Sequence, residues 1–101
     1  MKVITSQGYR DYEIVEAKKE ALAGSTAIDL VVWATGLQDL DGEDVSILSD
    51  GHHTYEAARE LGLKINYIVE SHPDGLTGED LLEAAWMDED YHYLESGSPV
   101  W

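Results

Sequence analysis

The fold of this chain is decided by the stretch Val45-Ser46-Ile47-Leu48-Ser49-Asp50-Gly51-His52-His53-Thr54-Tyr55-Glu56-Ala57-Ala58-Arg59-Glu60-Leu61-Gly62. Its apolar start predicts a short strand, and the Asp-Gly pair that follows predicts a sharp turn. Apolar residues then recur at helical spacing over 53–61, and Gly62 is placed to end a helix there. The stretch therefore predicts a strand that turns directly into a helix.

This turn is also the best candidate for a binding site. The first backbone N–H groups of a helix have no partner inside the helix and carry partial positive charge, so they attract anions. We therefore expect a phosphate or nucleotide site formed by Asp50, Gly51, His52, His53 and Thr54. The alternative is a well-capped turn with exposed polar residues, in which Asp50 serves as the N-cap.

Strands are predicted on both sides of this unit. Residues 28–33 are rich in β-branched and aromatic side chains, which predicts a central strand, and the turn residues that follow predict antiparallel pairing with residues 44–48. Residues 63–69 alternate apolar and polar, which predicts another strand. Strand, turn, helix and strand together predict a compact βαβ-like unit.

The two ends of the chain complete the expected architecture. We expect β structure at 3–6 and 12–15, a helix over 16–23, a helix over 79–87 that begins with a Thr77–Asp80 capping box, and an edge strand at 91–94. The 101 residues are predicted to form one α+β domain, 1–101, with a small mixed β-sheet of four to six strands and two or three helices.

The composition excludes several classes of function. The formal net charge of -15 comes from 21 acidic against 6 basic side chains, and a polyanion such as DNA or RNA would be repelled. The absence of cysteine excludes disulfides and thiolate chemistry. No stretch has the length of a membrane span or the pattern of a leader peptide, so we expect a cytoplasmic protein with no membrane partner.

Residues 48–63 resemble the ParB/sulfiredoxin-like superfamily, also called ParB-like nuclease domains. The resemblance is carried by six positions: Gly51, Tyr55, Ala57, Ala58, Leu61 and Gly62. It extends over about 28–70, with the strand at 65–69 where the family has one. It implies the small mixed sheet of that family, with an acidic helix and tail at 71–101 added, and a pocket for a nucleotide phosphate.

The family's functional residues are replaced in this chain. ParB proteins usually have Gly-Glu-Arg-Arg here, so His52, His53 and Thr54 stand in place of a metal-binding Glu and two phosphate-binding Arg residues. Sulfiredoxins have Gly-Cys-His-Arg, of which only the His is kept, at His53. A guanidinium group binds phosphate with two hydrogen-bond donors and a permanent positive charge, whereas an imidazole offers at most one donor per nitrogen. The resemblance therefore implies a degenerate motif with no catalytic residue and no resident cofactor.

The four histidines do not predict a metal site. His52 and His53 are neighbours, and no two histidines have the i, i+4 spacing that places both rings on one helical face. The strongly negative field of the chain is expected to raise the pKa of these histidines, which would favour anion binding near neutral pH.

The acidic residues after position 70 predict a different function. No Lys or Arg follows Lys64, and the candidate interaction surface consists of Asp74, Glu79, Asp80, Glu83, Asp88, Glu89, Asp90 and Glu95. Such a surface can bind a basic protein, including a nucleic-acid-binding enzyme or complex whose DNA it imitates. We therefore expect a phage or mobile-element protein that acts by protein binding, for example as an inhibitor of a host defence complex. The alternative is a module that binds or hydrolyses CTP or ATP, with Mg²⁺, at Gly51–Thr54.

Overall fold

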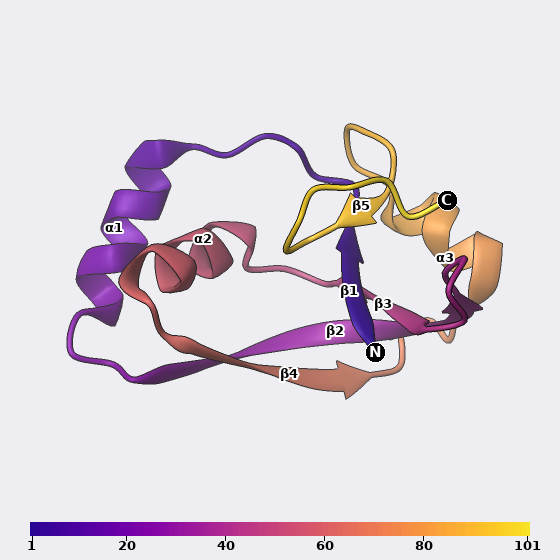
Figure 1. Cartoon of the computed structure of the whole chain (residues 1–101), viewed down its shortest axis with the longest axis horizontal. Helices are drawn as coiled ribbons and strands as arrows, with labels where there is room; N and C mark the ends of the chain where they lie inside the picture. The colour runs from indigo at the N-terminus through magenta and orange to yellow at the C-terminus, as the bar shows by residue number, and fades with distance from the viewer.

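The computed structural model describes residues 1–101, and three helices and a five-stranded mixed sheet confirm the expected α+β class. The elements are β1 (Lys2–Thr5), α1 (Tyr12–Leu22), β2 (Ala27–Gln38), β3 (Asp44–Leu48), α2 (His52–Leu61), β4 (Lys64–Glu70), α3 (Gly78–Ala85) and β5 (His92–Tyr93). Helices α1 and α2 lie together at one end of the long axis, and α3 lies at the other (Figure 1). None of the helices combines the length and the hydropathy needed to cross a membrane.

The strands lie in the order β4-β2-β3-β1-β5. Strand β2 pairs antiparallel with β3, with Trp33 opposite Ile47, which confirms the predicted hairpin. On its other side β2 pairs parallel with β4, and β1 pairs parallel with β3. The predicted βαβ-like unit is therefore wrong in its topology, because β2 lies between β3 and β4 and these two strands run in opposite directions. The short turn after β2 forces β3 to occupy one edge of β2 and leaves only the other edge for β4.

Two local predictions at the ends of the chain are also wrong. Residues 12–15 begin helix α1 rather than a strand, because the Asp11 carboxylate accepts the Glu13 backbone N–H at 3.0 Å and caps the helix. The helix formers that follow then outweigh the β propensity of Ile14 and Val15. Thr77 is the N-cap of α3 but its side chain makes no capping hydrogen bond, so the predicted capping box is not formed.

The sheet has an apolar core on each face. On one face Leu81 of α3 is fully buried against Ile4, Val45 and Ile47. On the other face Tyr55 of α2 packs with the second cluster, whose other buried members are Leu30, Val32, Leu48 and Leu94. Strand β2 contributes side chains to both clusters, because successive residues of a strand point to opposite faces of the sheet. Helix α2, and with it the predicted site, is thereby fixed over one face of the sheet.

Candidate functional site

The turn between β3 and α2 has the predicted geometry. Gly51 has a φ of 85°, a left-handed conformation that costs an L-residue energy, and a Cβ at this position would lie 3.1 Å from Leu30 Cδ2. Gly51 itself is the N-cap of α2, and no side chain caps this end of the helix. The expectation that Asp50 is the N-cap is therefore wrong, because its carboxylate instead accepts the Gly51 backbone N–H at 2.7 Å.

His52 is a buried residue that connects α2 to β1. Only 5% of its surface is exposed, and its Nε2 lies 2.7 Å from the Thr5 hydroxyl oxygen. That oxygen already accepts the Gln7 backbone N–H, so the hydroxyl is free to donate to an unprotonated Nε2. Burial, together with the nearby positive charge of Arg10, lowers the pKa of His52 from 6.5 to about 4. The expected rise in pKa is thus wrong for His52, because desolvation outweighs the negative field.

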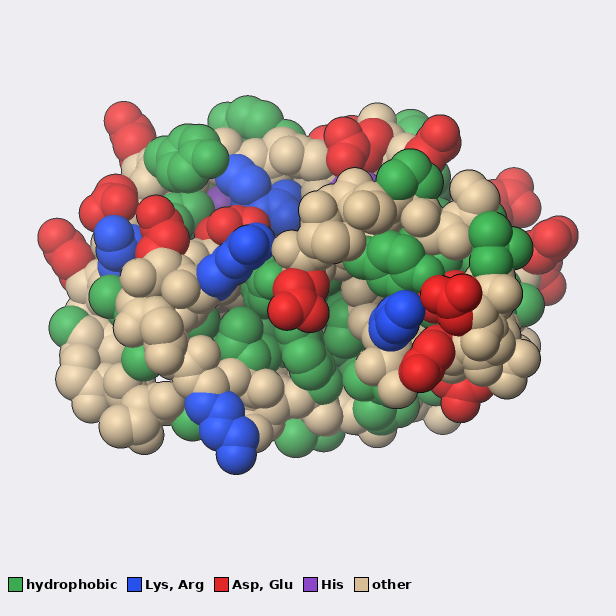
Figure 2. Space-filling model, in the orientation of Figure 1, with side chains coloured by type: hydrophobic (Ala, Val, Ile, Leu, Met, Phe, Trp, Pro, Cys, Tyr) green, Lys and Arg blue, Asp and Glu red, His purple; other side chains and the backbone are tan.

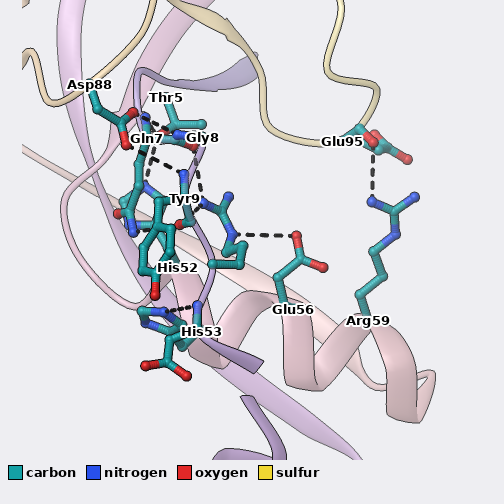
Figure 3. Close-up of polar contacts among 12 residues, drawn as sticks. Thr5, Gln7, Gly8, Tyr9, His52, His53, Glu56, Arg59, Asp88 and Glu95 are labelled. Atoms are coloured by element: carbon teal, nitrogen blue, oxygen red, sulfur yellow. Dashed lines mark hydrogen bonds and ion pairs between the residues drawn. The ribbon is translucent and has the colours of Figure 1, made fainter. Parts of the chain in front are cut away.

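His53 makes the second connection between α2 and the N-terminal segment. Its Nε2 accepts the Asp11 backbone N–H at 3.1 Å, just before α1 begins (Figure 3). An imidazole that accepts through Nε2 is neutral and carries its proton on Nδ1. Both histidines are therefore engaged in holding residues 5–11 against the first turn of α2.

A cavity of about 370 Å³ lies at this end of α2. It is lined by Gln7, Lys18, Asp50, Gly51, His52, His53 and Thr54, so all five predicted residues meet in one place. The backbone N–H groups of His52, His53 and Thr54 form no hydrogen bond within the protein. Lys18 of α1 adds an ammonium group to the cavity. Nothing in the sequence around Lys18 indicated that it belongs to this site. This donor set fits an anion better than a divalent cation, because Asp50 supplies the only carboxylate.

Arg10 is a further functional candidate that the sequence interpretation missed. Its Nη1 donates to the carbonyl oxygens of Gln7 and Tyr9, each at 3.0 Å, and its Nε lies 3.6 Å from Glu56 Oε1 in α2 (Figure 3). The buried Nε makes no hydrogen bond. Arg10 lines a second cavity, of about 320 Å³, together with Arg59. The fold thus brings Arg10 to the same cavity as Arg59 of α2.

The predicted acidic residues lie in and before α3 and in the segment that follows it. Asp88, Glu89 and Asp90 lie near the N-terminal segment, where the Asp88 carboxylate accepts the Gly8 backbone N–H at 2.8 Å. Glu95 lies beside Arg59, which donates to the Glu95 carbonyl oxygen at 3.4 Å (Figure 3). Asp74, Glu79, Asp80 and Glu83 lie in and before α3. Glu89 and Glu95 line the same cavity as Arg10 and Arg59, and the role of these acidic residues as an interaction surface stays a prediction.

The carboxylates in and before α3 have no Lys or Arg side chain within ion-pair distance. The carboxylates of Asp74, Glu79, Asp80 and Glu83 form no ion pair, and neither do those of Asp88, Asp90 and Glu95, whereas Glu89 lies 3.3 Å from His92 Nδ1. Acidic side chains occur at both ends of the molecule, but most Lys and Arg side chains lie toward the α1–α2 end (Figure 2). Trp86 and Met87, directly after α3, are 53% and 51% exposed. We call Asp74, Glu79, Asp80, Glu83, Trp86 and Met87 the α3 surface.

The structure contains no group of three or more His, Asp or Glu side chains placed to hold a metal ion. In comparisons with known proteins, no protein-family model, no curated protein and no solved structure matches the chain. The likeness of residues 48–63 to ParB-like domains therefore stays a prediction from the sequence.

Proposed function

We propose that this protein binds a basic protein partner through the α3 surface. The proposal rests on one observation: the unpaired carboxylates of α3 stand next to two large, half-exposed apolar side chains, Trp86 and Met87. An exposed tryptophan beside charged residues is typical of a protein interface, because the ring supplies buried area and the charges steer the encounter.

The charge of α3 favours a partner with a positively charged groove. Glu79 and Asp80 lie in the first turn of one short helix and Glu83 in the next, and Asp74 adds negative charge shortly before the helix begins. Negative charge repeated along a rod is what a nucleic-acid channel recognises. We therefore infer a partner that is a nucleic-acid-processing or defence enzyme, bound by a ParB-like protein of a phage or mobile element as an inhibitor. On this proposal the protein is not itself an enzyme.

The test starts with affinity capture from the native host and continues with the purified partner. Replacing Glu79, Asp80 and Glu83 by Gln, Asn and Gln should lower the association rate at least about tenfold at 50 mM salt, and the difference should shrink as salt rises. Trp86→Ala should instead raise the dissociation rate.

The matched control also removes three negative charges, by replacing Glu13, Glu20 and Glu60 with Gln. These residues lie in α1 and α2 and are exposed as well. This control should bind nearly as the parent does. Equal effects of the two triple variants would show that net charge alone drives capture, and unchanged binding in all variants would refute the α3 surface as the interface.

A second candidate function is favoured by the three unpaired backbone N–H groups at the α2 N-terminus and by Lys18 beside them. Such a group of donors fits a phosphate, as expected of a nucleotide-binding or nucleotide-hydrolysing module. Calorimetry with CTP, ATP and their Mg²⁺ complexes tests it. Binding that Lys18→Ala weakens and Lys19→Ala leaves unchanged would support this candidate, and no heat in any titration would remove it.

A further inference from the structure

Strand β4 forms an open edge of the sheet. It stands at one end of the strand order, and its only strand partner is β2. The pairing with β2 runs without a bulge from Ala27 opposite Lys64 to Trp33 opposite Glu70. The strand contains no proline, and its only charged residues are the two at its ends, Lys64 and Glu70. Protected edges usually have a proline, a bulge or a central charge, so β4 lacks the common defences against pairing with another strand.

The backbone of β4 presents three free hydrogen-bonding positions. The Lys64 N–H points inward, where it donates to the Thr26 carbonyl at 3.1 Å. Since the backbone groups alternate in direction along a strand, the N–H and C=O of Ile65, Tyr67 and Val69 point away from β2. These three residues form the unpaired ladder of the sheet edge.

A second copy of the same strand fits this ladder in one best register. In an antiparallel pair centred on Tyr67, Ile65 of each copy lies opposite Val69 of the other, and Tyr67 lies opposite itself. All three outward positions are then paired, which gives about six backbone hydrogen bonds. Sliding one copy by two residues leaves only two paired positions, and sliding it by one residue opposes outward groups to inward ones.

The side-chain charges select the same register. Centring the pair on Tyr67 brings Lys64 of each copy opposite Glu70 of the other, so two ion pairs close the ends of the ladder. These are positions without direct backbone bonds, where opposite side chains approach most closely. The pairing also covers Ile68 and Val69, which are 44% and 52% exposed.

We propose that two copies of this chain associate through antiparallel pairing of their β4 strands, forming a continuous ten-stranded sheet with a two-fold axis at Tyr67. The backbone ladder supplies the attraction, and the Lys64–Glu70 pairs supply the register and the specificity for self. The net charge of -15 on each copy opposes association, so the dimer forms at high protein concentration.

Sedimentation equilibrium of charge variants tests the proposal. Lys64→Glu and Glu70→Lys should each weaken the dimer at least about tenfold, because each replaces two attractive pairs by two repulsive ones. A mixture of these two variants should form a heterodimer, since both pairs become attractive again. Glu70→Lys is the more decisive variant, because it makes the chain less negative and would strengthen any dimer governed by net charge. Glu20→Lys, in α1, is the matched control and should not weaken the dimer.

Amide hydrogen exchange locates the contact. The amides of Ile65, Tyr67 and Val69 should become protected as the protein concentration rises, whereas the inward amides of Asn66 and Ile68 should not change. The proposal would be overturned if the protein stayed monomeric at all concentrations up to about 1 mM. It would also be overturned if β4 paired with a strand of another protein and not with a second copy of itself. A dimer indifferent to both charge variants would overturn it as well.

Discussion

The protonation of His52 is expected to limit the stability of the fold in mild acid. His52 is buried against Thr5 with an unprotonated Nε2, and its pKa is lowered from 6.5 to about 4. The unfolded chain therefore binds a proton between pH 6.5 and 4 that the folded chain does not. The stabilising effect of the neutral ring is fully present above pH 6.5 and is lost as the pH falls toward 4.

The magnitude follows from the two pKa values. With 6.5 in the unfolded chain and about 4 in the folded chain, linkage gives a loss of about 1.8 kcal/mol in the free energy of unfolding between pH 7 and pH 5. The full shift of about 2.5 pH units corresponds to roughly 3.4 kcal/mol as an upper limit.

Urea unfolding at pH 7 and pH 5, followed by tryptophan fluorescence, measures this loss. The matched variant is His52→Gln, whose amide can reach Thr5 but does not titrate. Because the carboxylates titrate alike in both proteins, the difference between the two pH dependences isolates the histidine. The parent should lose about 1.8 kcal/mol more than the variant over this interval. Parallel pH dependences in the two proteins would refute the buried, neutral ring.

Three further predictions concern the core, the turn and a carboxylate. Leu81→Ala should lower the free energy of unfolding by about 3 kcal/mol, because the side chain is fully buried, and urea unfolding measures it. Gly51→Ala should cost about 1–2 kcal/mol in the same assay, since φ is 85° and the new methyl would crowd Leu30. Tyr93→Phe removes the 2.7 Å hydrogen bond that is the main cause of the low Asp39 pKa of about 2, so NMR titration should find this pKa raised toward 3.8. The loss of stability that Asp39 causes as the pH falls from 3.8 to about 2 should then be smaller, and an unchanged pKa would contradict the role of this bond.

The local elements could be predicted where short-range physics decides them. The apolar runs of β2, β3 and β4 and the glycine at each end of α2 specify strand, turn and helix without reference to the rest of the chain. The beginning of α1 could not be predicted in this way, because Tyr12, Ile14 and Val15 favour a strand by themselves. The Asp11 cap, held in place by His53, settles that segment as helix.

The candidate site was predicted only in part for a similar reason. Residues 50–54 are contiguous, so the sequence alone groups them at a helix N-terminus. Lys18 and Arg10 reach α2 only because α1 packs against it. The low pKa of His52 likewise depends on burial against β1, which no local pattern reports.

The sequence by itself determined the α+β composition and the βα turn at Gly51, because helices, strands and turns depend on neighbours within a few positions. The lack of basic residues after Lys64 is read directly from the sequence. Only the tertiary structure decided that β2 separates β3 from β4, that His52 is buried, and that β4 is left with an open edge. Strand order, burial and charge neighbourhoods depend on contacts between residues far apart in the chain, and the free energy of those contacts is fixed only when the whole sheet is assembled.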